Sequence, residues 1–179
     1  MPQVIVLLRG INVGKAKRVA MAELRRLLTD LGYDNPRTLL NSGNAVIGCT
    51  AGQTRSAAAT IRHGIAEQLG VDCAVLTRTE AELRRAIETN PIPAGTEEPA
   101  RYLLGFLSGR PTAAQVRQFE SGDYGTDELR IVGDTAYLWC RDGINDSPLT
   151  KLNWRSLGLD VTTRNWSTVL KLDALCAKG

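Results

Sequence analysis

The chain has 179 residues and a formal net charge of +3, with 43% hydrophobic and 23% charged residues. These proportions belong to a folded globular protein and exclude a disordered one. The length suits one domain of ordinary size or two small units that share a core. Proteins that bind nucleic acid usually carry a larger positive charge, so only a local cluster of cations would support that function here.

Cysteine spacing and hydropathy restrict the cellular compartment. The four cysteines are scattered, with no C-x-x-C pair and no cluster with histidine. This pattern favours neither a zinc site nor a disulfide framework, so we expect no metal and no cofactor. Arg9 interrupts the first apolar run early, which indicates a strand rather than a signal peptide. No segment approaches the roughly 20 apolar residues that span a bilayer, and we predict a cytoplasmic protein without membrane contact.

Strands and helices alternate in the first half of the chain. The apolar run at residues 3–8 predicts a buried central strand. Leucines at helical spacing from Leu24 to Leu31 predict an amphipathic helix that stops at Gly32. Thr79 and Glu82 form a capping box that predicts the start of another helix. The remaining expected elements are strands at 37–41, 44–48 and 71–77 and a helix over 55–69.

The segment 90–99 contains three prolines and a glycine and marks a boundary between two units, which we place at 1–90 and 91–179. Beyond it, the order of elements repeats that of the first half. We therefore expect an α+β fold of tandem ferredoxin-like βαββα units with mainly antiparallel sheets. The expected elements are strands at 101–107, 128–132 and 135–140 and helices starting near Pro111, at Ser147-Pro148 and near Thr163.

One edge of the first predicted sheet collects polar residues. With right-handed crossovers, strands 3–8 and 37–41 run in the same direction, so loop 9–20 and turn 41–44 emerge together. The loop carries RGINVGKAKR, with four cations, two glycines and no acid, and the turn carries NSGN. Glycine N–H groups, cations and neutral amides together suit an anion. We predict a site for a phosphate- or carboxylate-bearing small molecule, with ligand-binding residues Arg9, Asn12, Lys15, Lys17, Asn41, Ser42 and Asn44.

A competing interpretation of the same residues is a solvated charge run that faces a hairpin, because Asn and Gly often serve turns alone. The segment TTRNW near the C-terminus is a second candidate. Thr162 or Thr163 would cap the last helix, whose exposed N–H groups favour an anion. This places Arg164 and Asn165 in the first turn, and we add both to the candidate ligand-binding residues.

No conventional catalytic set is present. The run GINVGK has three residues between its glycines instead of the four of a P-loop, and Ala16 follows the lysine, so we reject an NTPase. The single histidine, His63, lies off the apolar face of its helix and is expected to be exposed. This leaves no Ser–His–Asp or Cys–His arrangement, and catalytic residues are not assigned.

The motifs LLRGINVGK, MAELRRLLTDLG, NSGN and TRNWSTVLKL resemble those of a widespread bacterial family of uncharacterised domains, over nearly the whole chain. The resemblance implies a fold of two ferredoxin-like units and implies little about activity. Relatives often have a proline near position 20, where this chain has Ala20, so the first helix is free to begin earlier, through Ala16 and Val19. The family's motif positions fall here on Arg9, Gly10, Asn12, Gly14, Lys17, Ser42, Gly43, Asn44, Thr163, Arg164, Asn165 and Trp166.

Three functions stay open at this point. The first is an anion- or nucleotide-binding domain. The second is a nucleic-acid-binding module, which would need exposed aromatic side chains on a sheet. The only aromatics on predicted strands that could serve are Tyr102, Phe106, Tyr137 and Trp139, residues that more often lie in a core. The third is a protein-interaction scaffold without chemistry. The sequence indicates no oligomeric state.

Overall fold

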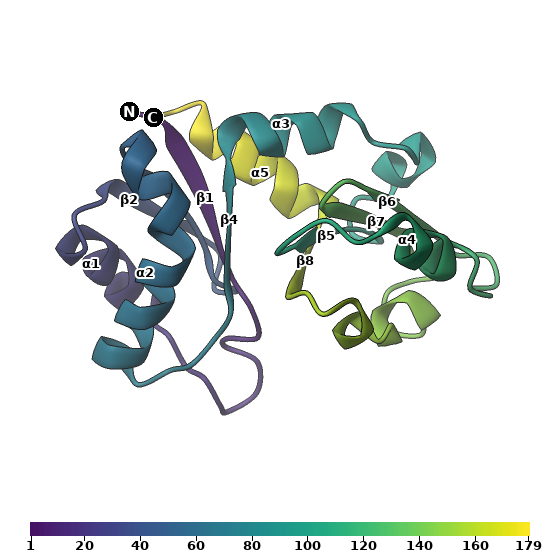
Figure 1. Cartoon of the computed structure of the whole chain (residues 1–179), viewed down its shortest axis with the longest axis horizontal. Coiled ribbons are helices and arrows are strands. Elements are labelled where there is room, and N and C mark those ends of the chain that lie inside the picture. The colour runs from purple at the N-terminus through teal and green to yellow at the C-terminus, as the bar shows by residue number, and fades with distance from the viewer. The chain divides into compact units, whose positions relative to one another are not determined.

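The computed structural model describes residues 1–179, which form two compact units. The first unit comprises Met1–Arg85 and Lys171–Gly179, and the second comprises Ala86–Leu170. Each unit holds one four-stranded antiparallel sheet, and the chain has five α-helices in all (Figure 1). The fold is therefore a mixed α and β fold with antiparallel sheets, as the sequence predicts. None of its helices combines the length and the apolar character that crossing a bilayer requires.

In the first sheet the strands lie in the order β2-β3-β1-β4. Strand β3 pairs antiparallel with both β1 and β2, so β1 and β2 run in the same direction and end at the same edge, as predicted. The elements of this unit are β1 (Gln3–Leu8), α1 (Met21–Asp30), β2 (Asp34–Leu39), β3 (Asn44–Gly48), α2 (Ala51–Leu69), β4 (Val75–Thr79), most of α3 (Glu80–Glu88) and the end of α5 (Trp166–Cys176).

Strand β1 is the centre of the first unit. All side chains from Val4 to Leu8 are fully buried, because successive residues of a strand point to opposite faces and both faces are covered. Val4, Val6 and Leu8 pack into the cluster that α1 and α2 cover, and Ile5 and Leu7 face the other side. Each such side chain contributes about 1.5–3 kcal/mol on burial. The prediction of a buried central strand is confirmed.

Helix α1 begins at Met21, so the chain does not use its freedom to begin this helix earlier, through Ala16 and Val19. The cause is Asn12, whose side chain donates to the carbonyl of Val19 and accepts from its N–H group. These two bonds close residues 12–19 into a loop and leave no continuous helix. The predicted stop at Gly32 is confirmed, because this residue takes a φ of 83° after the helix ends.

Other boundaries of the first unit move by several residues. Helix α2 begins at Ala51, four residues before the expected start, because Thr50 and Gln53 form a capping box that the periodicity does not reveal. Strand β2 covers Asp34–Leu39 instead of 37–41, and β4 covers Val75–Thr79 instead of 71–77. The capping box of Thr79 with Glu82 is confirmed and starts α3.

The second sheet has the order β6-β7-β5-β8. Residues on one face of β5 and β7 pack with Phe119 of α4 and with Leu149 and Leu157, which lie on two short 3-10 helices. The other face carries Tyr102, whose ring stacks on Trp166 at 5.3 Å between ring centroids. The elements of this unit are the end of α3, η1 (Pro93–Glu97), β5 (Tyr102–Leu107), α4 (Ala113–Glu120), β6 (Glu128–Val132), β7 (Thr135–Trp139), η2 (Pro148–Lys151), η3 (Trp154–Leu157), β8 (Val161–Asn165) and the start of α5.

Two predictions in the second unit are wrong. The helix expected to start at Ser147-Pro148 is a pair of short 3-10 helices, because Leu152 takes an extended conformation between them. This break lets Leu149 and Leu157 both reach the same core. The expected helix start near Thr163 is a strand, β8, which pairs with β5. Helix α5 begins only at Trp166, and its apolar face of Trp166, Val169, Leu172 and Cys176 is buried.

Candidate anion-binding site

Loop 9–20 and the β2–β3 connection lie side by side at the edge where β1 and β2 end. The N–H group of Leu8 donates to the carbonyl of Gly43 at 2.8 Å, and that of Arg9 donates to the carbonyl of Ala74 at 2.9 Å. We call residues 9–18 the cationic loop and residues 40–43 the hairpin turn. The predicted meeting of these two segments is therefore present in the structure.

Asn12 connects the two segments through its side chain. Its amide nitrogen donates to the carbonyl of Val19 at 2.8 Å and to the carbonyl of Asn41 at 2.7 Å. Its amide oxygen accepts from the N–H group of Val19 at 2.9 Å. The backbone N–H group of Asn12 donates to the carbonyl of Lys17, which closes the tip of the loop. The polar atoms of Asn12 are thus occupied within the protein, and the residue shapes the site from within.

The backbone of the loop takes left-handed conformations that suit its glycines. Gly10 and Gly14 have φ values of 65° and 64°, and a Cβ added to either would meet no atom within 4 Å. Asn12 and Lys17 take φ values of 54° and 51°. Asn tolerates this region because its short side chain bonds locally. The space beside both glycines is open, so a ligand can reach their backbone.

The hairpin turn approaches the loop closely at Gly43. This residue has a φ of 84°, and an added Cβ would lie 2.7 Å from Cβ of Leu8 and 2.9 Å from Cδ1 of Ile11. Asn44, which follows the turn, is fully buried, and its amide nitrogen donates to the carbonyl of Leu39 and to the hydroxyl of Ser42. The predicted ligand residue Asn44 therefore shapes the turn from inside.

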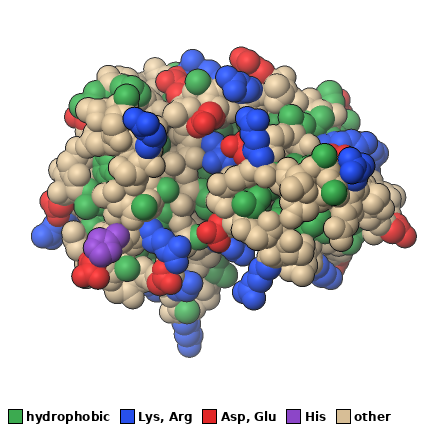
Figure 2. Space-filling view, viewed as in Figure 1, with side chains coloured by type: hydrophobic (Ala, Val, Ile, Leu, Met, Phe, Trp, Pro, Cys, Tyr) green, Lys and Arg blue, Asp and Glu red, His purple; other side chains and the backbone are tan.

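Of the remaining predicted residues on the cationic loop, Lys15 and Lys17 are exposed and Arg9 is half-buried. Arg18, which is not among the predicted ligand-binding residues, is exposed as well, and Lys15, Lys17 and Arg18 form no ion pair. In the space-filling view, Lys and Arg side chains project where Figure 1 draws the loop after β1 (Figure 2). Asn41 and Ser42 are also exposed on the adjoining turn. Charged groups and neutral hydrogen-bonding groups thus share one edge of the first sheet.

Arg164 and Asn165 belong to the second unit and lie on β8, not in the first turn of a helix. The guanidinium group of Arg164 donates to the hydroxyl of Thr162 at 2.9 Å and to the carbonyl of Thr163 at 2.8 Å. Burial lowers the pKa of Arg164 to about 10. The side-chain oxygen of Asn165 accepts from the N–H group of Thr168, so Asn165 is the N-cap of α5 in place of the expected threonines.

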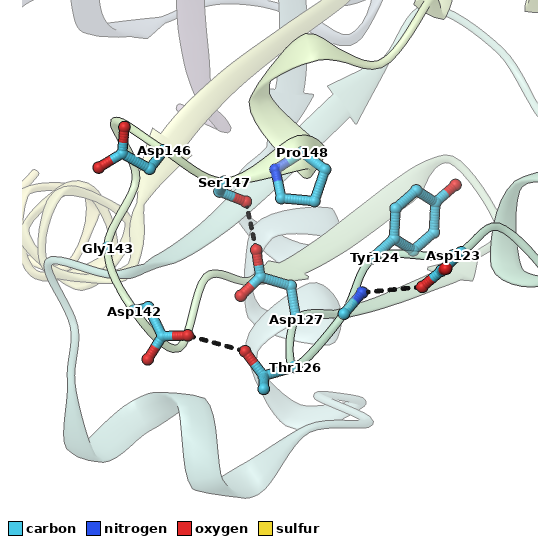
Figure 3. Close-up of a pocket in the computed structure, with 10 residues that line it drawn as sticks. Asp123, Tyr124, Thr126, Asp127, Asp142, Gly143, Asp146, Ser147 and Pro148 are labelled. Carbon is cyan, nitrogen blue, oxygen red and sulfur yellow. Dashed lines mark hydrogen bonds between the residues drawn. The ribbon is translucent and has the colours of Figure 1, made fainter.

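The second unit contains a hollow of about 520 Å³ that the sequence did not indicate (Figure 3). Asp127 accepts from the hydroxyl of Ser147 and from the N–H group of Arg141, and Asp142 accepts from the hydroxyl of Thr126. These bonds give both carboxylates a structural role in holding turns. Four aspartates flank the β6–β7 hairpin at spacings of four, which is the one sequence signal for this feature. They are Asp123, Asp127, Asp142 and Asp146.

The reactive side chains of the chain are dispersed or buried. No three His, Cys, Asp or Glu side chains are arranged to hold a metal ion. All four cysteines are free and buried. Burial raises the pKa of the thiols of Cys73 and Cys140, and that of Cys176 to about 11, so these thiols stay protonated near neutral pH. His63 is exposed, as predicted.

Comparison with known proteins agrees with the fold and adds no activity. The model of the family described as "Protein of unknown function (DUF1697)" matches residues 1–137. The conserved bacterial protein SP0830 from Streptococcus pneumoniae has a similar structure, with a TM-score of 0.78 and 21% sequence identity. The match covers 98% of this chain and 98% of that one. Among curated proteins, none matches the chain.

Proposed function

The chain belongs to the DUF1697 family of proteins of unknown function, and we propose that its first unit binds an anion through phosphate or carboxylate groups. The ligand contacts the cationic loop and the hairpin turn. One observation carries the proposal. Three unpaired cations, Lys15, Lys17 and Arg18, stand on a loop whose backbone Asn12 fixes against the neighbouring turn.

Hydrogen bonds that already order the loop support binding. A flexible loop would have to be ordered when the ligand binds, and the entropy lost in ordering it would weaken binding. Ordering one backbone residue costs roughly 1–2 kcal/mol, and an exposed ion pair contributes only about 0–1 kcal/mol. In a mobile loop, the free energy that ordering costs would therefore cancel the free energy that the cations contribute. Here the hydrogen bonds of Asn12 and the backbone bonds of Leu8 and Arg9 order the loop before any ligand arrives.

The proposal is limited to residues of the first unit. Arg9, Lys15, Lys17 and Arg18 supply charge. Asn41 and Ser42 supply neutral donors, as do the backbone N–H groups of Gly10 and Gly14. Asn12 and Asn44 keep the site in shape and do not contact the ligand. Arg164 and Asn165 form no part of it, since the second unit uses them in β8 and at the cap of α5.

Thermal unfolding with added anions tests the proposal. Inorganic phosphate, nucleotides and dicarboxylates are titrated against the full chain, and a ligand at 100 times its Kd is expected to add about 2.7 kcal/mol of stability. The test variant combines Lys15→Gln, Lys17→Asn and Arg18→Gln, because Asn tolerates the positive φ at position 17. Arg55→Gln, an exposed cation of α2, is the matched control.

The expected result is a rise in Tm for the native chain and for Arg55→Gln, and a much smaller rise for the triple variant. An equal rise in all three proteins would assign binding to another surface. If none of the anions raises the Tm of the native chain, the proposed function is wrong.

We also propose that the two units are tandem ferredoxin-like repeats in a reducing cytoplasm, where four free cysteines persist. Equivalent hydrogen bonds support the repeat. The N–H groups of Leu8 and Leu107 donate to the turns of their hairpins, at Gly43 and Asp134. The edge strands β4 and β8 share Val-x-Thr-Arg, and both arginines are buried and bond the preceding carbonyl. An experimental structure in which the strands of the two units do not superpose in this register would contradict the repeat.

A further inference from the structure

The open position of the cations restricts which phosphate ligand the cationic loop suits. Lys15, Lys17 and Arg18 are exposed, and so are Asn41 and Ser42 of the hairpin turn. One exposed cation strengthens the binding of one anion by about fivefold at most. A small anion contacts only one or two of these side chains at a time, so its binding stays weak. A ligand with phosphates in a row contacts all three together.

The grouping of the cations suits a nucleic-acid strand. Residues 12–17 form a turn that the hydrogen bond from the N–H group of Asn12 to the carbonyl of Lys17 closes, so Lys15, Lys17 and Arg18 come from one short segment. A nucleic-acid strand carries one phosphate per 3.4 Å of helix axis and therefore presents several phosphates to such a segment at once. Ser and Asn side chains and backbone N–H groups are the usual neutral partners of phosphates in such complexes. Ser42, Asn41 and the backbone at Gly14 supply these groups beside the cations.

The structure also restricts how such a strand is recognised. Recognition of single-stranded RNA on a sheet needs exposed aromatic rings that stack on bases. Tyr102, Phe106, Tyr137 and Trp139 are all buried, so the second sheet offers no such platform. On the cationic loop the one large apolar side chain that is exposed is Val13, which has no ring. Stacking on bases therefore does not contribute here, which leaves contacts with phosphates and sugars, independent of base sequence, as the main source of binding.

We infer that the cationic loop and the hairpin turn bind the phosphate backbone of nucleic acid without base specificity. The inference rests on the proposed function and names its ligand class. The exposed, unpaired cations at positions 15, 17 and 18 carry the binding, and counterions released from the phosphates drive it.

Salt dependence gives a sharp test. A fluorescently labelled 20-base-pair duplex is titrated with the full chain by anisotropy at 50 to 200 mM NaCl. Three phosphate contacts predict a slope of log K against log salt of about −2.7, so affinity falls about 40-fold over this range. Lys15→Gln alone is expected to make the slope shallower by about 0.9. The triple variant is expected to lose binding, and Arg55→Gln to keep the native slope.

Each other outcome overturns the inference. In one outcome, phosphate or a nucleotide raises the Tm but the duplex binds no more tightly than the mononucleotide. The proposal of anion binding then stands, and the inference of nucleic-acid binding is wrong. If none of these ligands binds, both anion binding and nucleic-acid binding are wrong. If vesicles of anionic phospholipid bind the chain and the duplex does not, the loop binds a lipid surface instead of nucleic acid. Affinities that differ tenfold between two unrelated duplex sequences contradict backbone-only contact. Circular dichroism of the variants separates a lost contact from a lost fold.

Discussion

The side-chain amide of Asn12 donates a hydrogen bond of 2.7 Å to the backbone carbonyl of Asn41, which lies 29 residues further along the chain. The same amide also closes the loop on Val19. One side chain thus fixes the shape of the cationic loop and its position against the hairpin turn. The two halves of the candidate site are coupled through this residue, which makes it the first target for mutation.

Replacement of Asn12 is expected to loosen the site and destabilise the first unit. Asn12→Ala removes three side-chain hydrogen bonds worth about 0.5–1.5 kcal/mol each, and alanine is less tolerant of the φ of 54°. The free energy of unfolding, measured in urea, is expected to fall by about 2–4 kcal/mol. Asn12→Gly loses the same bonds but accepts the positive φ, so its loss should be smaller. A variant Asn12→Ala as stable as the native chain would show that the loop is held by other contacts.

Substitution at Gly43 is expected to be more damaging than substitution at Gly14. Both have positive φ, and this alone costs an alanine about 1–2 kcal/mol. At Gly43 the new Cβ would also lie 2.7 Å from Cβ of Leu8 in the central strand, whereas at Gly14 it meets nothing within 4 Å. Overpacking adds about 1–3 kcal/mol at the first position. Equal losses for Gly43→Ala and Gly14→Ala in urea unfolding would argue against this close approach.

Much of the first unit follows from patterns that one segment carries by itself. The apolar run of β1, the leucine spacing of α1 and the capping box at Thr79 each depend on neighbours within a few residues. The meeting of the loop and the turn follows from the direction of β1 and β2, which the handedness of crossovers predicts. For this reason the place of the candidate site could be predicted from the sequence.

The roles of individual side chains at the site could not be predicted in the same way. Asn12 and Asn44 were expected to face a ligand, yet both direct their amides at backbone carbonyls. An amide suits either use, and the choice depends on left-handed backbone conformations that no local pattern specifies. Strand β8 was missed for a related reason. Its five residues show no clear alternation, and pairing with the edge of β5 is what makes them a strand.

The corrected start of α5 leads to a prediction about caps. Asn165 accepts a hydrogen bond from the N–H group of Thr168, so Asn165→Ala is expected to lower stability by about 1 kcal/mol. Asn165→Asp keeps an acceptor at the cap and should restore most of the loss. Thr163 is exposed on β8 and caps nothing, so Thr163→Ala should change stability by less than about 0.5 kcal/mol. If Thr163→Ala loses more stability than Asn165→Ala in thermal or urea unfolding, the last helix begins near Thr163 and not at Trp166.

The buried thiol of Cys176 predicts a loss of stability at alkaline pH. Burial raises its pKa from 9.0 to about 11, and the carboxylates of Glu80 and Asp173 act in the same direction, whereas the guanidinium groups of Arg37 and Arg84 oppose it. Between these two values the unfolded chain has lost the thiol proton and the folded chain has kept it. The stabilisation is therefore complete below pH 9 and is lost as the pH rises through about 11.

Urea midpoints at pH 8 and pH 10.5 check this dependence. The native chain is expected to lose more stability between the two values than Cys176→Ala, which has no thiol to ionise. The comparison uses the change with pH, because the smaller side chain also leaves a cavity that lowers stability at both values. Burial also raises the pKa of Tyr102 and Tyr137, but both tyrosines are present in both proteins and cancel in the comparison. Equal losses in the two proteins would mean that the thiol ionises as readily in the folded chain as in the unfolded one.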